Sequence, residues 1–450
     1  MEISAVSRGR RAVLAVALSG LVAAFGACGD DGSSSTSGTA GRTATVADGE
    51  KVTGKLTYWF APTAPAERAW WERFVERFER RHPGAEVDLT TYSTEEYFTK
   101  VLAAFTSGDE PDLFHTDTGE YLDKFVRTGK IAALNDLVDR GDYAPASLEP
   151  LTAPDGALYG VPDYWYVLAM WDNVDLLAEH GLRPPRTWDE LLGVCSVLGA
   201  AGVVPIAFGD GGQDQWTAGH WVDTLIYQYG GAKAVADATY GTGGASWSDE
   251  PIVEGASRFA ELVDADCFPK GFTGMNYTQA SALFLRGRAG LTFTGTWFAP
   301  QIASEAGDFA VEVTPMPDGP GATRSTASAE GIVGGVSALA ATTKATAANP
   351  ALVAAFLNEF GAEADAYANA TDQLSVAADP QPKGGGLQAR LTRLLTSVGE
   401  LGPVTDITVP GMLRDPYLQQ VQALSAGDLS PQQFGDAMAE IVERERPNFP

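Results

Sequence analysis

Cysteine and histidine are scarce in this chain, with three cysteines and four histidines among 450 residues. The histidines lie far apart in the sequence, and none has the spacing of metal ligands (His82, His115, His180 and His220). The sequence also lacks a Gly-x-Ser-x-Gly elbow, a His-Glu-x-x-His pair and a cysteine near a fitting histidine. We therefore expect no metal, no other cofactor and no catalytic centre of these kinds.

Basic residues are also few: 31 lysines and arginines stand against 58 acidic side chains, which gives a net charge of −27. Nucleic acid and anionic membrane surfaces both need a basic face, so neither is an expected partner. The Gly-rich loop 209–213 lacks the lysine and the serine or threonine of a phosphate-binding loop. This absence argues against nucleotide binding.

Long apolar runs are missing apart from Ala12–Val22, which is shorter than the roughly 20 residues needed to span a bilayer. This run follows three arginines and precedes the small pair Gly26-Ala27, a pattern that predicts an export signal over residues 1–27. Loss of this segment removes three arginines and one glutamate and leaves a net charge of −29.

The end of the export signal, Phe25-Gly26-Ala27-Cys28, resembles the lipobox of bacterial lipoproteins. In that family the cysteine is lipidated, becomes the new N-terminus and holds the protein at the membrane. We expect this of Cys28, with the protein anchored on the extracellular side of the cell membrane. A plain secreted protein cut nearby is the alternative, and Arg10-Arg11 leaves export by a twin-arginine route open.

The residues after Cys28 are mostly glycine, serine, threonine and aspartate, without apolar periodicity. Residues 28–51 are therefore predicted to be a lipidated cysteine and a flexible tether. The remaining body of about 400 residues is larger than a single core supports, so two domains are expected. Outside the cytoplasm the last two cysteines, Cys195 and Cys267, can pair. A disulfide and two buried thiols both stay open.

Strands and helices alternate along the first part of the body. Strands are predicted at 56–60, 85–90 and 111–114. Helices are predicted around residues 70–78, ending at the breaker His82-Pro83-Gly84, and at 97–105 and 120–127. This order favours a parallel sheet with helices on both faces. Ligands of such sheets bind beyond the carboxyl ends of the strands, which places loops 61–67, 92–95 and 117–120 at the candidate site. Further on, the pattern predicts strands at 203–208, 290–294 and 308–313, and helices at 173–180, 280–288, 349–370 and 416–446.

Five segments in order carry a resemblance to one family. They are LTYWFAP at 56–62, PDLFHTDTGEYLDKFVRTGKIAALNDL at 111–137, YGVPDYWYVLAMWDNVDLLAEHGLRPPRTWDELL at 159–192, PIAFGD at 205–210 and ALFLRGRAGLTFTGTW at 282–297. Together they resemble the bacterial extracellular solute-binding proteins of ABC importers, in the sugar-binding branch that includes maltose-binding protein. The resemblance implies an α/β fold of the two-lobed periplasmic-binding-protein type (type II), each lobe a mostly parallel sheet flanked by helices and joined by a hinge.

The same resemblance implies the lobe boundaries and the function. The N-terminal lobe would hold residues 52–161 and about 290–345, and the C-terminal lobe 162–289 and about 346–450. The protein would be a monomer and not an enzyme, capturing a mono- or oligosaccharide between the lobes and handing it to ABC permease subunits. The alternatives are a surface-anchored glycoside hydrolase, a binder of a polyol or other non-carbohydrate solute, and a protein that serves a membrane sensor.

Candidate ligand contacts are aromatic rings, which stack on the C–H faces of sugars, and polar side chains, which bind hydroxyls. Trp297 ends a strand after Gly295-Thr296 and matches the family's Gly-x-Trp, although it could also be a core residue. Asp117 follows a strand and could instead cap the next helix. The full set of candidates is Trp297, Tyr166, Trp165, Asp163, Asp117, Trp216, Gln215, Tyr92, Trp59, Thr63 and Glu67.

Overall fold

The computed structural model describes residues 52–327, 331–381, 387–397 and 400–449. The predicted export signal, the lipidated Cys28 and the tether lie outside the described residues. Among the described residues, no helix is both long and apolar enough to cross a bilayer.

A single sheet runs through the described residues in the order β2-β1-β3-β8-β4-β6-β5, with β7 paired to β4 and β9 paired to β8. Its strands are β1 Thr53–Phe60, β2 Gly84–Thr91, β3 Leu113–Asp117, β4 Val161–Asn173, β5 Val204–Ala207, β6 Ala289–Gly295, β7 Val311–Thr314, β8 Gly331–Ala341 and β9 Glu400–Gly402. The neighbours β1 and β2, β1 and β3, and β5 and β6 are parallel.

Two long central strands, β4 and β8, connect the two ends of this sheet. One end of β8 pairs with β3, from Leu113 opposite Ala341 to Asp117 opposite Ser337. The first half of β4 pairs with β8, and its second half pairs with β6 and β7. All of these pairings are antiparallel. The chain therefore crosses between the two ends of the sheet along β4 and β8.

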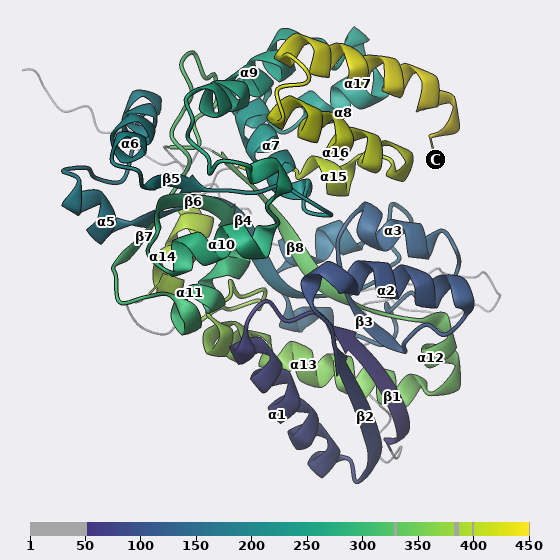
Figure 1. The fold of residues 1–450 in the computed structure, drawn as a ribbon. Coiled ribbons are helices and arrows are strands. Elements are labelled where there is room, and N and C mark those ends of the chain that lie inside the picture. Colours follow the sequence, from purple (N-terminus) through teal and green to yellow (C-terminus); the bar gives the residue numbers. More distant parts are fainter. Residues whose placement is uncertain (1–51, 328–330, 382–386, 398–399, 450) are drawn as a thin grey trace, which may run out of the picture. The chain divides into compact units, whose positions relative to one another are not determined.

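The first part of the body is built on β1, β2 and β3. Its helices are α1 Pro65–Arg81, α2 Thr94–Ser107, α3 Glu120–Val126, α4 Pro145–Leu148, α12 Thr343–Ala348 and α13 Pro350–Thr371. Helix α1 buries Trp70, Phe74 and Phe78, spaced four residues apart on one face. That face packs against Phe356 and Phe360 of α13, and Figure 1 shows α1 and α13 beside β1 and β2.

The second part is built on β5, β6 and β7. Its helices are α5 Val174–Glu179, α6 Trp188–Ala200, α7 Trp216–Gly230, α8 Ala234–Tyr240, α9 Glu250–Asp264, α10 Tyr277–Leu285, α11 Ala299–Glu305, α14 Leu387–Ser397, α15 Thr405–Thr408, α16 Gly411–Ser425 and α17 Pro431–Glu445. The central helix α7 is buried along nearly its whole length. It packs against α9, α15 and α16, which Figure 1 shows gathered around it with α17.

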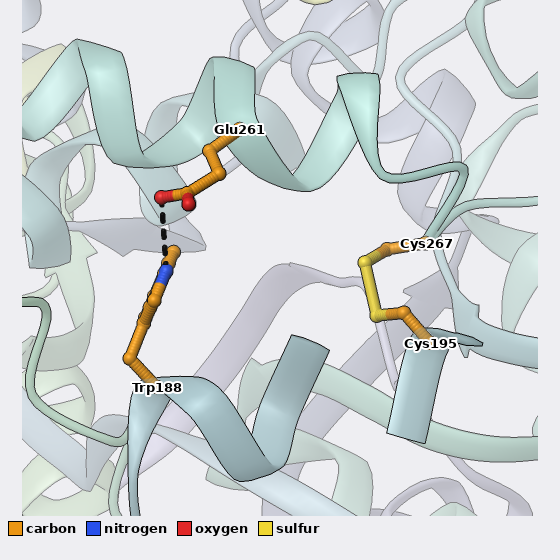
Figure 2. Close-up of a disulfide and its surroundings, with 4 residues drawn as sticks. All are labelled: Trp188, Cys195, Glu261 and Cys267. Atoms are coloured by element: carbon orange, nitrogen blue, oxygen red, sulfur yellow. Dashed lines mark hydrogen bonds between the residues drawn. A yellow bond between two sulfur atoms is a disulfide. The ribbon is translucent and has the colours of Figure 1, made fainter. Parts of the chain in front are cut away.

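A disulfide joins Cys195 of α6 to Cys267, which follows α9 (Figure 2). Of the two alternatives that the sequence left open, the structure has the bonded pair. A few residues away, Trp188 Nε1 donates to Glu261 Oε2 at 3.0 Å, a second link between α6 and α9 (Figure 2). Two links of different kinds therefore fix α6 against α9.

Most predicted elements are present, with shifted ends. The predicted strand 111–114 appears as β3, which extends to Asp117 because its pairing with β8 continues that far. The aromatic stretch 163–166 lies inside the long strand β4. Strand β6 pairs with β5, and α13 packs on α1. The lobe boundaries themselves stay a prediction.

Candidate ligand-binding cleft

A cavity of ≈ 510 Å³ lies between the first and second parts of the body, next to β4. Residues from both parts line it, so neither part forms the site alone. The residues that line it include Thr63, Asp117, Tyr121, Lys124, Tyr164, Tyr166, Asp214, Gln215, Trp216, His220, Tyr277, Trp297, Gln301, Asp406, Ile407 and Arg414. The volume falls within the range of about 300–1,000 Å³ typical of small-molecule sites.

Aromatic rings from separate elements form one wall of the cleft. Trp216 of α7 lies 5.0 Å from Tyr277 of α10 and 5.9 Å from Trp297, measured between ring centroids. Tyr166 of β4 and His220 of α7 lie 5.1 and 5.7 Å from Trp297. Burial lowers the pKa of His220 to about 3, so this ring is neutral at pH 7. The wall therefore consists of uncharged aromatic rings.

Hydrogen bonds fix the two tryptophans of this wall. Trp297 follows β6 in the short helix η5 Thr296–Phe298, and its Nε1 donates to Tyr277 Oη at 3.1 Å. Its ring folds back over Gly295, where a Cβ atom would collide with it. Trp216 Nε1 donates to Asp214 Oδ1 at 3.0 Å, and Asp214 Oδ2 accepts the backbone N–H of Tyr277 at 2.8 Å. One carboxylate therefore positions both Trp216 and Tyr277.

Charged side chains line the cleft on the side of α3, α15 and α16. Asp117 ends β3, and the structure gives its carboxylate no hydrogen-bond partner among the described residues. Tyr121 and Lys124 come from α3, Asp406 from α15 and Arg414 from α16. The Lys124 ammonium lies 5.2 Å from the Tyr121 ring centroid, and the Arg414 guanidinium lies 4.8 Å from it.

Burial raises the pKa values of the two carboxyl groups and lowers the pKa of the Lys124 ammonium group. Burial, reinforced by the nearby charge of Asp406, raises the pKa of Asp117 to about 7. Burial and the positive charge of Arg414 lower the pKa of Lys124 to about 8. Burial also raises the pKa of Asp406, although Arg414 opposes the shift. Near pH 7 the Asp117 carboxyl group is therefore partly protonated, and only the protonated form can donate a hydrogen bond as well as accept one.

Glu67 lies beneath the cleft lining, where it is 1% exposed and contacts Thr63. Glu67 Oε2 accepts the Thr63 N–H at 3.1 Å, and Gln373 Nε2 donates to Oε1 at 3.0 Å. Thr63 Oγ1 lies 2.5 Å from Glu67 Oε1 and 3.3 Å from the Trp297 carbonyl oxygen, and the Thr63 backbone carbonyl accepts from Gln301 Nε2 at 3.0 Å. Burial raises the pKa of Glu67 to about 7. Glu67 therefore positions Thr63, which holds the Trp297 backbone.

Asp163 lies deeper still, fully buried in β4. Its Oδ1 accepts the Tyr164 N–H at 2.9 Å, and its Oδ2 lies 3.7 Å from His115 Nε2. Burial raises the pKa of Asp163 well above its ordinary value. It also lowers the pKa of His115 to about 4, and this ring is hydrogen-bonded to Ser337 Oγ at 2.6 Å. Among the described residues these groups link β3, β4 and β8 under the cleft.

The structure brings six of the eleven candidate ligand residues together in the cleft lining: Thr63, Asp117, Tyr166, Gln215, Trp216 and Trp297. The other five do not line it. Glu67 and Asp163 lie beneath the cleft, and Trp165 is half-buried, with its backbone N–H donating to the Leu374 carbonyl at 3.0 Å. Trp59 of β1 and Tyr92, directly after β2, pack against each other with their ring centroids 5.2 Å apart.

Several lining residues were not predicted from the sequence. They are Tyr121, Lys124, Tyr164, Asp214, His220, Tyr277, Gln301, Asp406 and Arg414. Tyr121 and Lys124 lie in the predicted helix directly after the Asp117 loop, so the spacing of that helix could have shown them. Asp406 and Arg414 come from a C-terminal segment with no local signal, and only the fold brings them to the cleft.

Residues 61–367 match the family of bacterial extracellular solute-binding proteins. Because the match covers more than half of the chain, the chain belongs to this family, as its sequence segments indicated. Members of the family bind solutes, and the chain is an extracellular solute-binding protein.

Individual relatives are distant. An ABC transporter extracellular-binding protein of Pyrococcus horikoshii is 24% identical over 249 residues, 54% of this chain and 56% of that protein. The chain thus spans little more than half the length of this relative. A fructooligosaccharide ABC transporter substrate-binding protein, FusA of Streptococcus pneumoniae, is 28% identical over 233 residues, 44% of this chain and 42% of its own.

Solved structures confirm the predicted two-lobed α/β fold. A structure from a study of xylan utilization by Caldanaerobius polysaccharolyticus has a TM-score of 0.78 at 22% identity, covering 86% of this chain and 100% of that chain. A chitin oligosaccharide binding protein has a TM-score of 0.75 at 22% identity, covering 87% of this chain and 98% of its own. At this identity the likeness concerns the fold alone.

Proposed function

We propose that this protein captures a mono- or oligosaccharide in the cleft and hands it to the permease of an ABC importer. The observation that carries the proposal is the pairing of an aromatic wall, Trp216 with Tyr277 and Trp297, with the hydroxyl-binding groups Asp117 and Gln215 in one cleft. Sugars present apolar C–H faces to rings and hydroxyls to carboxylates and amides, so both kinds of group are needed.

The sheet supports a hinge mechanism for capture. The strands β4 and β8 are shared by both parts of the body, and each part has its own helices and core residues. Bending of these two strands opens or closes the cleft without unfolding either part. We therefore assign the first part of the body, with α12 and α13, to one lobe. The second part, with α15, α16 and α17, forms the other.

The names of the similar proteins define a panel of sugars for the first experiment. They include fructooligosaccharide, chitin oligosaccharide and maltose binders, and a protein from a study of xylan utilization. The protein without residues 1–27, with Cys28→Ser, is heated with each sugar and with polyols as controls. A ligand at 100 times its Kd stabilises the folded state by about 2.7 kcal/mol, which gives a clear rise in Tm.

Each outcome of this experiment has a meaning. A rise in Tm with one class of sugar supports the proposal and names the substrate class. A rise only with polyols or other solutes overturns the sugar assignment. Release of shorter sugars after incubation would instead make the protein a glycoside hydrolase. Anchoring is tested separately: Cys28→Ser in the full chain should move the protein from the membrane fraction to the soluble one.

A further inference from the structure

The two parts of the body touch directly at the cleft, at the start of α3. Gly119 precedes α3 with φ +61°, and a Cβ atom there would collide with the Ile407 carbonyl oxygen of α15. A Cβ on Gly411 of α16 would likewise collide with the Glu120 carboxylate. Glycines at both positions therefore allow α3 to approach α15 and α16 closely.

Three side chains form a polar contact at this point, here called the clasp: Tyr121, Asp406 and Arg414. Arg414 donates from a terminal guanidinium nitrogen to Tyr121 Oη, and the same nitrogen lies 3.5 Å from Asp406 Oδ2. Tyr121 Oη donates to Asp406 Oδ2 at 3.4 Å. The Asp406 side chain is 5% exposed and that of Arg414 is 26% exposed, so water screens the contact only in part.

The second part of the body holds its half of the clasp rigidly. Asp223 of α7 is buried, and its Oδ2 accepts the Thr405 N–H at 2.9 Å, directly beside Asp406. Asp223 Oδ1 accepts from Tyr417 Oη at 2.6 Å, three residues after Arg414 on α16. One carboxylate on α7 thus ties down both α15 and α16. The clasp therefore has a fixed anchor and needs no ligand atom to complete it.

We propose that the clasp holds the cleft closed before ligand enters, with Arg414 as a positioning residue that sets Tyr121 at the cleft wall. This inference rests on the proposed function, because it assumes a protein that opens and closes around a solute. Contacts made within the protein contribute to the closed form whether or not ligand is present. The ligand-free protein then samples the closed form in a substantial fraction, and ligand binding shifts that population further.

The test measures closure in the ligand-free protein. Cysteines replace Lys100 of α2 and Asp428 after α16, both exposed, in the protein without residues 1–27 that carries Cys28→Ser. The native Cys195–Cys267 disulfide leaves no other free thiol for spin labels. Distances between the labels are then measured for the unaltered clasp, for Arg414→Gln, for Tyr121→Phe and for both together. The control is Arg444→Gln, whose arginine pairs with Glu445 on the exposed side of α17.

We expect a short-distance population in the ligand-free protein that falls by about tenfold in Arg414→Gln, because the variant loses the hydrogen bond from the charged guanidinium to Tyr121. Tyr121→Phe should lower it as well, and the double variant should resemble Arg414→Gln, since both changes break one unit. Arg444→Gln should change nothing. A purely structural role would lower Tm without moving the distances.

Two results would overturn the proposal. One is a ligand-free protein whose distances are the same with and without the clasp. The other is additive effects of the two substitutions, which would mean independent contacts. Tyr121→Phe keeps the ring and serves as the mild variant if Arg414→Gln folds poorly. The measurement needs no sugar, so a failed sugar screen leaves it readable, and a failed clasp leaves the sugar assignment standing.

Discussion

Trp297→Ala is the sharpest test of the cleft. The Trp297 ring is half-buried and lies within 6 Å of three other rings of the wall: 5.1 Å from Tyr166, 5.7 Å from His220 and 5.9 Å from Trp216. Burial of a whole large side chain is worth about 1.5–3 kcal/mol. If a sugar covers the exposed part of the ring, Trp297→Ala should reduce its binding free energy by about 1.5–2 kcal/mol. This change raises Kd by roughly 10–30-fold.

The competing explanation is that Trp297 only packs the hinge. Trp188→Phe is the matched control, because Trp188 is 3% exposed, lies outside the cleft and donates to Glu261. Loss of that hydrogen bond should cost about 1 kcal/mol of stability without changing Kd. Gly295→Ala keeps the indole but pushes it, since the added Cβ would collide with the ring. It should weaken sugar binding in the same direction as Trp297→Ala.

The assay pairs calorimetric titration with urea unfolding, using the sugar that raises Tm most in the panel. The unfolding free energy shows whether a variant remains folded, and Kd is compared only among folded variants. The reasoning is refuted if Trp297→Ala lowers the unfolding free energy while Kd stays unchanged. Trp297 would then belong to the packing of the hinge, and the aromatic wall would not contact ligand.

Two further predictions concern stability. Replacing Cys195 and Cys267 with serine opens a loop of sequence separation 72 and should lower the free energy of unfolding by about 4 kcal/mol in urea; an unchanged unfolding curve would contradict this. Burial raises the pKa of Glu67 from its ordinary 4.5 to about 7, so the folded state keeps a proton that the unfolded state loses. The contribution of the protonated Glu67 to the free energy of unfolding is fully present below pH 4.5. It falls by about 3 kcal/mol as the pH rises through 7. Glu67→Gln should flatten the fall in unfolding free energy between pH 5 and 8, and an equal fall in both proteins would contradict the assignment.

The fold could be predicted in its first part because local pattern and topology agree there. Trp70, Phe74 and Phe78 mark one face of α1, and the breaker at Pro83 ends the helix where the structure ends it, at Arg81. The long strands β4 and β8 were harder to predict. Both are almost wholly buried, so neither shows the alternation of apolar and polar residues by which a strand is recognised.

The cleft could be predicted where a residue directly follows a strand, as Asp117 follows β3 and Trp297 follows β6. Asp163 illustrates the limit: it lies in a buried strand, and alternation places Tyr164 and Tyr166 in the cleft lining while Asp163 points under it. The charged side, Asp406 and Arg414, could not be predicted because its position depends on how the C-terminal helices return across α7.

Helix α7 explains how the aromatic wall and the clasp can act together. Trp216 and His220 line the cleft, and Asp223 anchors α15 and α16. These residues are spaced four and three apart, so they lie along one face of the helix. A ligand that stacks on Trp216 contacts α7 directly, and the clasp is attached to α7 through Asp223. Both interactions therefore depend on the position of α7. If the clasp closes the cleft, sugar contact with the aromatic wall and contact between the lobes both stabilise the closed form. The loss of either contact should then favour the open form and weaken sugar binding.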